Sequence, residues 1–192
     1  MPRKKLIRSK TLPYHVTARS NNKEWFQLPL NQVWELSKES LKEASEVHPV
    51  ELISFVLMSN HYHMLLTTPQ GNLDGFIYEF NKRLALKIKA KSGQINRIFG
   101  GRYKWCLIES QKYLINCYRY IYQNPVRAGV VTRPEDYEFS SLRAILGRSK
   151  FSVPLHDRYG FKDEYGLNWL NETIDSVELE DLRKKLYRSV LS

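Results

Sequence analysis

Two histidines separated by one residue, His61 and His63, are the first candidates for chemistry in this chain. They lie in a run over residues 53–68 that is rich in β-branched, aromatic and aliphatic residues, which predicts one or two buried strands. Side chains on a strand alternate between faces, so both imidazoles point to one face and Tyr62 to the other. Two imidazoles spaced in this way can share a divalent cation, although histidine pairs in strands are more often half-buried polar residues.

A helix predicted over about residues 111–123 supplies the second group of candidates. Tyr118 and Tyr122 belong to its apolar stripe, whereas Tyr120 and Asn124 share another face one turn apart. Asn124 offers an amide oxygen that could complete a three-ligand set with the two histidines. A tyrosine hydroxyl, with an ordinary pKa of about 10, can attack a phosphodiester when a metal polarises the phosphate. The alternative is a buried tyrosine and a helix-capping asparagine.

The charge distribution predicts a polyanionic partner. The net charge is +10, and residues 1–10 and 82–104 contain basic side chains with no acidic ones. Blocks of one sign favour a nucleic-acid surface over a general solubilising face. The candidates for DNA contact are Arg3, Lys4, Lys5, Arg8, Lys82, Arg83, Lys87, Arg102, Lys104 and Arg127.

Hydrophobic periodicity predicts an α+β protein. Strands are expected over about residues 14–20, 50–58, 61–67 and 102–108, and helices over 32–47 and 73–91. The resulting β-α-β-β-α-β order is that of the ferredoxin-like, split βαβ fold, an antiparallel sheet with helices on one face. We expect a basic arm at 1–11, one domain at 12–146 and a C-terminal helical extension at 147–192, with its last helix over 177–191.

Composition narrows the class of protein further. Cys106 and Cys117 lack the spacing of a zinc knuckle or a disulfide framework, and no apolar run reaches the length of a membrane span. We therefore expect a soluble, cytoplasmic protein with free thiols.

The remaining histidines and two aromatic residues have no clear catalytic motif. His15, His48 and His156 have no partner pattern and are interpreted as structural or surface residues. Tyr103 and Trp105 are candidates for stacking on bases, with core packing equally favoured for Trp105.

The ordered pair His61-Tyr-His63 and Tyr120-Ile-Tyr-Gln-Asn124-Pro-Val-Arg-Ala-Gly129 resembles the single-tyrosine HUH transposases, which are IS200-like, and especially the REP-associated tyrosine transposases of bacteria. Matches at Tyr14-His-Val-Thr17, at Gly101-Arg-Tyr-Lys104 and over residues 134–141 extend the resemblance across about residues 12–146. The resemblance implies the same ferredoxin-like fold, with Tyr120 as nucleophile and His61, His63 and Asn124 as ligands of Mg²⁺ or Mn²⁺. The middle position of the histidine motif is usually a bulky aliphatic residue in this family, and we interpret Tyr62 there as packing.

The function implied by the resemblance is DNA transposition. Its members cleave and rejoin single-stranded DNA near hairpin-forming, REP-like palindromes, through a 5′-phosphotyrosine intermediate. One alternative is a domesticated protein that binds hairpin DNA without transposition activity. Replication-initiator or relaxase activity shares the chemistry, but the short chain shows no helicase or second domain. We expect single-stranded or hairpin DNA as partner, no membrane, and a monomer or homodimer.

Overall fold

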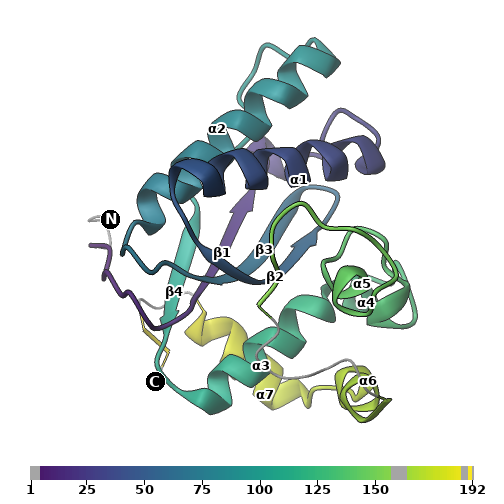
Figure 1. The fold of residues 1–192 in the computed structure, drawn as a ribbon. Coiled ribbons are helices and arrows are strands. Elements are labelled where there is room, and N and C mark those ends of the chain that lie inside the picture. Colours follow the sequence, from purple (N-terminus) through teal and green to yellow (C-terminus); the bar gives the residue numbers. More distant parts are fainter. Residues whose placement is uncertain (1–4, 157–163, 187–189, 192) are drawn as a thin grey trace.

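The computed structural model describes residues 5–156, 164–186 and 190–191, and it places one sheet between two layers of helices (Figure 1). Strand order in the sheet is β2-β3-β1-β4-β5. The strands are β1 (Tyr14–Arg19), β2 (Glu51–Leu57), β3 (His61–Thr67), β4 (Lys104–Ile108) and β5 (Val190–Leu191). Neighbours among β1 to β4 are antiparallel, whereas β5 lies parallel to β4. The predicted ferredoxin-like order is confirmed for the first four strands.

Two long helices, α1 (Leu30–Val47) and α2 (Leu73–Ser92), cover one face of the sheet, as the split βαβ pattern predicts (Figure 1). Their apolar stripes are fully buried, with Val33 and Leu41 from α1 and Phe76 and Phe80 from α2. The first helix begins at Leu30, two residues before the predicted start at residue 32. This face holds the larger of two apolar cores.

The opposite face carries helices that the sequence pattern did not assign to a face. They are α3 (Gln111–Tyr122), α4 (Asn124–Arg127), α5 (Leu142–Ile145), α6 (Glu164–Asn171) and α7 (Ser176–Lys185). A second apolar core lies here and includes Ile53 and Leu65 from the sheet with Tyr118 and Tyr122 from α3. Because helices bury both faces of β2 and β3, these strands form one nearly continuous apolar run in the sequence. Two short 3₁₀ turns, η1 (Asn21–Lys23) and η2 (Pro134–Asp136), complete the described elements.

The C-terminal extension belongs to this second layer rather than standing apart. Gln123 at the end of α3 donates its amide to the carbonyl oxygens of Leu170 and Glu172, at 2.9 and 2.6 Å. Asn116 of α3 donates to the Glu178 carboxylate of α7 at 2.7 Å. The predicted terminal helix is too long, since α7 ends at Lys185 and residues 190–191 pair with the edge of β4 instead.

Strand register decides which side chains face α3. Thr17 of β1 pairs with His63 of β3, and Arg19 pairs with His61. Because side chains alternate, the odd-numbered residues of both strands share the α3 face. Tyr62 therefore lies on the other face, where it is fully buried and donates its hydroxyl to Asn81 Oδ1 at 2.9 Å. The interpretation of Tyr62 as a packing residue agrees with this position.

Candidate active-site cleft

The two histidines of the motif lie side by side at the start of β3. The ring centroids of His61 and His63 are 5.1 Å apart, with the ring planes at 83°. Both line a cleft of about 870 Å³ between the sheet and α3. Burial lowers the pKa of both imidazoles, to about 4 for His61, so the rings are neutral near pH 7 and can act as ligands.

The hydrogen bonds of His61 leave one of its nitrogens available. Asn60 donates its Nδ2 to the carbonyl oxygen of Lys23 at 2.6 Å, which orients the Asn60 amide. Asn60 Oδ1 then faces His61 Nδ1 at 2.7 Å and can only accept. His61 Nδ1 therefore carries the proton, and Nε2 keeps a lone pair for a ligand in the cleft.

His63 has a partner that the sequence did not reveal. Its Nδ1 lies 2.9 Å from Nε2 of His15, and the two rings stack with centroids 5.1 Å apart. His15 is 3% exposed, and burial lowers its pKa to about 3, so it is neutral. When His63 Nδ1 donates to His15, His63 Nε2 is unprotonated and its lone pair faces the cleft.

Tyr120 lies across the cleft from the histidines. Its ring centroid is 5.7 Å from that of His63 and 6.3 Å from that of His15, and both contacts are edge-to-face. Burial raises the pKa of the hydroxyl, while the charges of Arg127 and Arg183 and a hydrogen bond with Arg183 lower it in part. The neighbouring Tyr118 and Tyr122 are fully buried in the second core, as the helical spacing predicts.

The junction between α3 and α4 places Asn124 and Arg127 beside Tyr120. Asn124 donates Nδ2 to the carbonyl oxygens of Tyr120 and Ile121, at 3.0 and 3.3 Å, which leaves Oδ1 as an acceptor at the cleft wall. Arg127 donates to the Tyr120 carbonyl at 2.6 Å, and its guanidinium lies 4.4 Å from the Tyr120 ring centroid. Gly129 ends this turn at φ +68°, a conformation that favours glycine.

The cleft is positively charged, as expected for a site that binds an anion. Among the residues described by the structure, its lining includes no carboxylate. The basic side chains that line it are Arg19, Lys23, Arg102, Lys104, Arg127 and Arg183. Burial lowers the pKa of Arg127 to about 10, so this arginine still carries its charge near pH 7. A phosphodiester entering the cleft would exchange water for these cations.

The donor set in the cleft fits a divalent cation that also binds the substrate. No group of three or more His, Cys, Asp or Glu suited to a metal occurs in the described parts of the chain. The available protein donors are therefore the two Nε2 atoms and the Asn124 amide oxygen. Such a set leaves positions for phosphate oxygens and water, as cations of the Mg²⁺ and Mn²⁺ type require.

The predicted DNA-binding residues divide into three groups. Arg3 and Lys4 lie outside the described residues. Three others are paired with carboxylates of other elements: Arg8 holds Asp74 with two hydrogen bonds, and Arg83 and Lys87 of α2 bind Glu43 of α1. Lys82 is paired within α2, 3.7 Å from Glu79. Lys5, Lys82, Arg102 and Lys104 line a second, larger groove, and Arg127 lines the cleft.

Sequence reasoning missed several contributors to the cleft, among them His15 and Arg183. The alternation in Tyr14–Arg19 does place His15, Thr17 and Arg19 on one face, but only the pairing of β1 with β3 brings His15 to His63. Arg183 comes from the extension, where no motif singled it out. Its position depends on the packing of α7 against α3. Trp105, 8% exposed and edge-on to Tyr14, packs in the first core.

The chain is similar to known transposases in sequence and in fold. A provisionally named REP-associated tyrosine transposase of Haemophilus influenzae is 27% identical over an alignment of 116 residues, and the match covers 54% of this chain. The chain spans 65% of the length of that relative. A solved structure of a REP-associated tyrosine transposase bound to a REP hairpin superposes with a TM-score of 0.65 and 19% identity, covering 82% of this chain and 93% of the other. This likeness shows a shared fold.

No helix in the described residues is long and apolar enough to cross a membrane.

The model of the IS200-like transposase family matches residues 8–124, a range that includes both histidines of the motif, His15, Tyr120 and Asn124. This match covers more than half of the sequence. The chain therefore belongs to the IS200-like transposase family.

Proposed function

We propose that this protein cleaves and rejoins single-stranded DNA next to hairpin-forming palindromes, with Tyr120 as the nucleophile. The observation that carries the proposal is the meeting, in one cationic cleft, of the Tyr120 ring with the neutral histidine pair. Family membership supports DNA strand transfer, and the structural relative was solved with a REP hairpin, which supports a palindromic substrate.

In the proposed reaction the Tyr120 hydroxyl oxygen attacks the phosphorus of a phosphodiester. A bond between this oxygen and phosphorus forms as the bond from phosphorus to the 3′ oxygen breaks. The phenolic proton passes to solvent, and the departing 3′ oxygen takes a proton to become a 3′-hydroxyl. The product is a 5′-phosphotyrosine, and attack by another 3′-hydroxyl reverses the step and joins two strands.

Arg127 and Arg183 stabilise the negative charge that develops on the phenolic oxygen and on the phosphate. His61, His63 and Asn124 would hold a Mg²⁺ or Mn²⁺ ion through Nε2, Nε2 and Oδ1. Such an ion, when bound, polarises the phosphate and lowers the barrier to attack. Asn60 keeps His61 Nε2 unprotonated, and His15 does the same for His63 Nε2 when it accepts from His63 Nδ1.

The test uses single-stranded hairpin DNA from the flanks of the gene, incubated with the protein and Mn²⁺. We expect a protein–DNA adduct that resists denaturant, vanishes in Tyr120→Phe and persists in the control Tyr118→Phe. Hairpin binding should be nearly unchanged in both variants. Tight binding with no adduct for several hairpins, in both Mg²⁺ and Mn²⁺, would instead identify a domesticated DNA-binding protein.

A further inference from the structure

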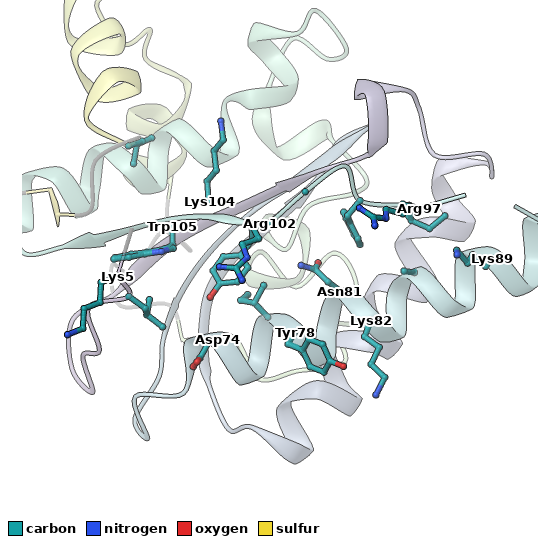
Figure 2. Close-up of a pocket in the computed structure, with 18 residues that line it drawn as sticks. Lys5, Asp74, Tyr78, Asn81, Lys82, Lys89, Arg97, Arg102, Lys104 and Trp105 are labelled. Carbon is teal, nitrogen blue, oxygen red and sulfur yellow. The ribbon is translucent and has the colours of Figure 1, made fainter. Parts of the chain in front are cut away.

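A second, larger groove lies between α2 and the segment of residues 97–105, on the face of the sheet away from Tyr120 (Figure 2). Its volume is about 1300 Å³, above the roughly 300–1,000 Å³ of sites for single small molecules. Figure 2 shows Tyr78 and Lys82 projecting from α2 on one side, with Arg102 and Trp105 on the other. The catalytic cleft does not use these α2 residues.

The groove carries a positive charge. Its basic lining residues are Lys5, Lys82, Lys89, Arg97, Arg102 and Lys104. Asp74 is the sole carboxylate among the described lining residues, and Arg8 neutralises it through hydrogen bonds of 2.8 and 2.7 Å. Neither Arg97 nor Arg102 forms an ion pair in the part of the chain that the structure describes. An occupant with several negative charges is therefore favoured.

The groove also offers flat and apolar surfaces. Tyr78 is 63% exposed, with the Lys82 ammonium 5.6 Å from its ring centroid, and the floor includes Ile77, Ile98 and part of Tyr103. Asn81 accepts from Tyr62, which leaves its Nδ2 as a donor toward the groove. Phosphates, π faces and hydrogen-bonding edges occur together in nucleic acid. The faces of the bases are accessible only where the strand is unpaired.

The groove and the catalytic cleft share one wall. Gly101, Arg102 and Lys104 line both. Lys104 pairs with Thr17 on the α3 face of the sheet, whereas the next residue, Trp105, packs on the α2 face. Gly100 lies close to η1, where a Cβ would be 2.9 Å from Asn21 Cα, and its N–H donates to the carbonyl oxygen of Arg19 in β1 at 3.1 Å. A strand that leaves the cleft can cross this wall directly into the groove.

We propose that the groove is a second DNA-binding site, which holds the unpaired strand adjoining the phosphodiester in the cleft. Phosphates bind to Arg97, Arg102 and Lys82, and a base stacks on Tyr78. The proposal rests on the proposed function for the class of ligand, but it requires no cleavage. Cleavage in the cleft and binding in the groove are therefore measured separately.

The experiment measures binding of a labelled single strand of about twelve nucleotides, within the site sizes of single-strand binding proteins, by fluorescence anisotropy in chelator. The variants are Tyr78→Ala and the pair Lys82→Glu with Arg97→Glu. The control pair, Lys42→Glu with Lys112→Glu, changes two exposed lysines outside both sites by the same total charge.

Tyr78→Ala should raise the single-strand Kd on the order of tenfold, the effect of losing one stacked base. The groove pair should also reduce the slope of log Kd against log salt by about 1.4, since two phosphate contacts are lost. Adduct formation at saturating DNA should persist in both. The proposal would be overturned if the groove variants bound the single strand as tightly as the control pair does. It would also be overturned if they lost as much affinity for blunt duplex DNA as for the single strand. Absence of any adduct in wild type would refute the proposed cleavage alone.

Discussion

His15 Nε2 lies 2.9 Å from His63 Nδ1, inside a stack of two neutral imidazoles. The contact joins β1 to β3, and it makes His15 a positioning residue for a proposed metal ligand. The hydrogen bond offsets part of the cost of burying both imidazoles. Asn60 orients His61 in the same way, so each histidine of the motif has a hydrogen-bond partner that orients its ring.

Replacing His15 by leucine should weaken Mn²⁺ binding and slow adduct formation by about 10- to 100-fold, because His63 loses the acceptor that holds its tautomer. His15→Gln keeps an acceptor near the Nε2 position and should recover part of the loss. Calorimetric titration with Mn²⁺ checks the affinity, and His156→Leu, at an exposed histidine, serves as control. Equal Mn²⁺ affinity in wild type and His15→Leu would remove His15 from the site.

At Asn60, aspartate and alanine should behave differently. Asn60→Asp retains the oxygen that accepts from His61 Nδ1 and loses only the donor to the Lys23 carbonyl. Asn60→Ala loses both the acceptor and the donor. The Mn²⁺ concentration that it needs for adduct formation should therefore be about tenfold or more above that of the aspartate variant. The half-saturating Mn²⁺ concentration for adduct formation measures the difference. If the two variants match, anchoring of the Lys23 loop matters more than the orientation of His61.

The rate of adduct formation should increase with pH between 7 and 9. Burial raises the pKa of Tyr120, so the phenolate fraction grows about tenfold per pH unit below that pKa. Arg183→Gln removes a charge that lowers the pKa, so the profile should move to higher pH. Because Arg183 is exposed and screened, the loss at pH 7.5 should be less than about tenfold. The neighbouring Lys184→Gln is the control, and an unshifted profile in Arg183→Gln argues against this role.

Acid should destabilise the metal-free protein through its buried histidines. The pKa of His15 falls from 6.5 to about 3 on folding, so the unfolded chain binds more protons below pH 6.5. The free energy of unfolding should then fall by on the order of 1–2 kcal/mol between pH 6.5 and 5 for this residue. Urea titrations in chelator measure it. His15→Leu should flatten the dependence; an unchanged slope would mean that His15 is hydrated or charged.

Arg83 and Lys87 should contribute to stability rather than to DNA binding. Both bind Glu43 of α1, at 3.0 and 2.9 Å. The pair Arg83→Gln with Lys87→Gln should lower the Tm slightly and leave the single-strand Kd within about twofold, since paired charges release few counterions from DNA. Lys82 also lies 3.7 Å from a carboxylate, that of Glu79, but its side chain is half exposed and lines the groove, so Lys82→Gln should weaken binding more. Similar losses of single-strand affinity in both variants would support the sequence-based interpretation of all basic residues in 82–104 as a DNA surface.

Local periodicity in the sequence was enough to predict several features. The alternation in a strand placed His61 and His63 on one face and Tyr62 on the other. Helical spacing separated Tyr120 from the packing residues Tyr118 and Tyr122, and the order of elements predicted the ferredoxin-like sheet. These properties depend on residues close together along the chain, whose relative directions the backbone geometry of a strand or helix determines.

Other features depended on which elements become neighbours. His15 reaches His63 only because β1 pairs with β3 in one register, and Arg183 reaches Tyr120 only because α7 packs on α3. The antiparallel approach of α1 and α2 neutralises Arg83 and Lys87, which a charge count treats as free. Such contacts join residues far apart in sequence. Packing and strand register select them, so only the tertiary structure could decide the supports of the site and the location of the cationic groove.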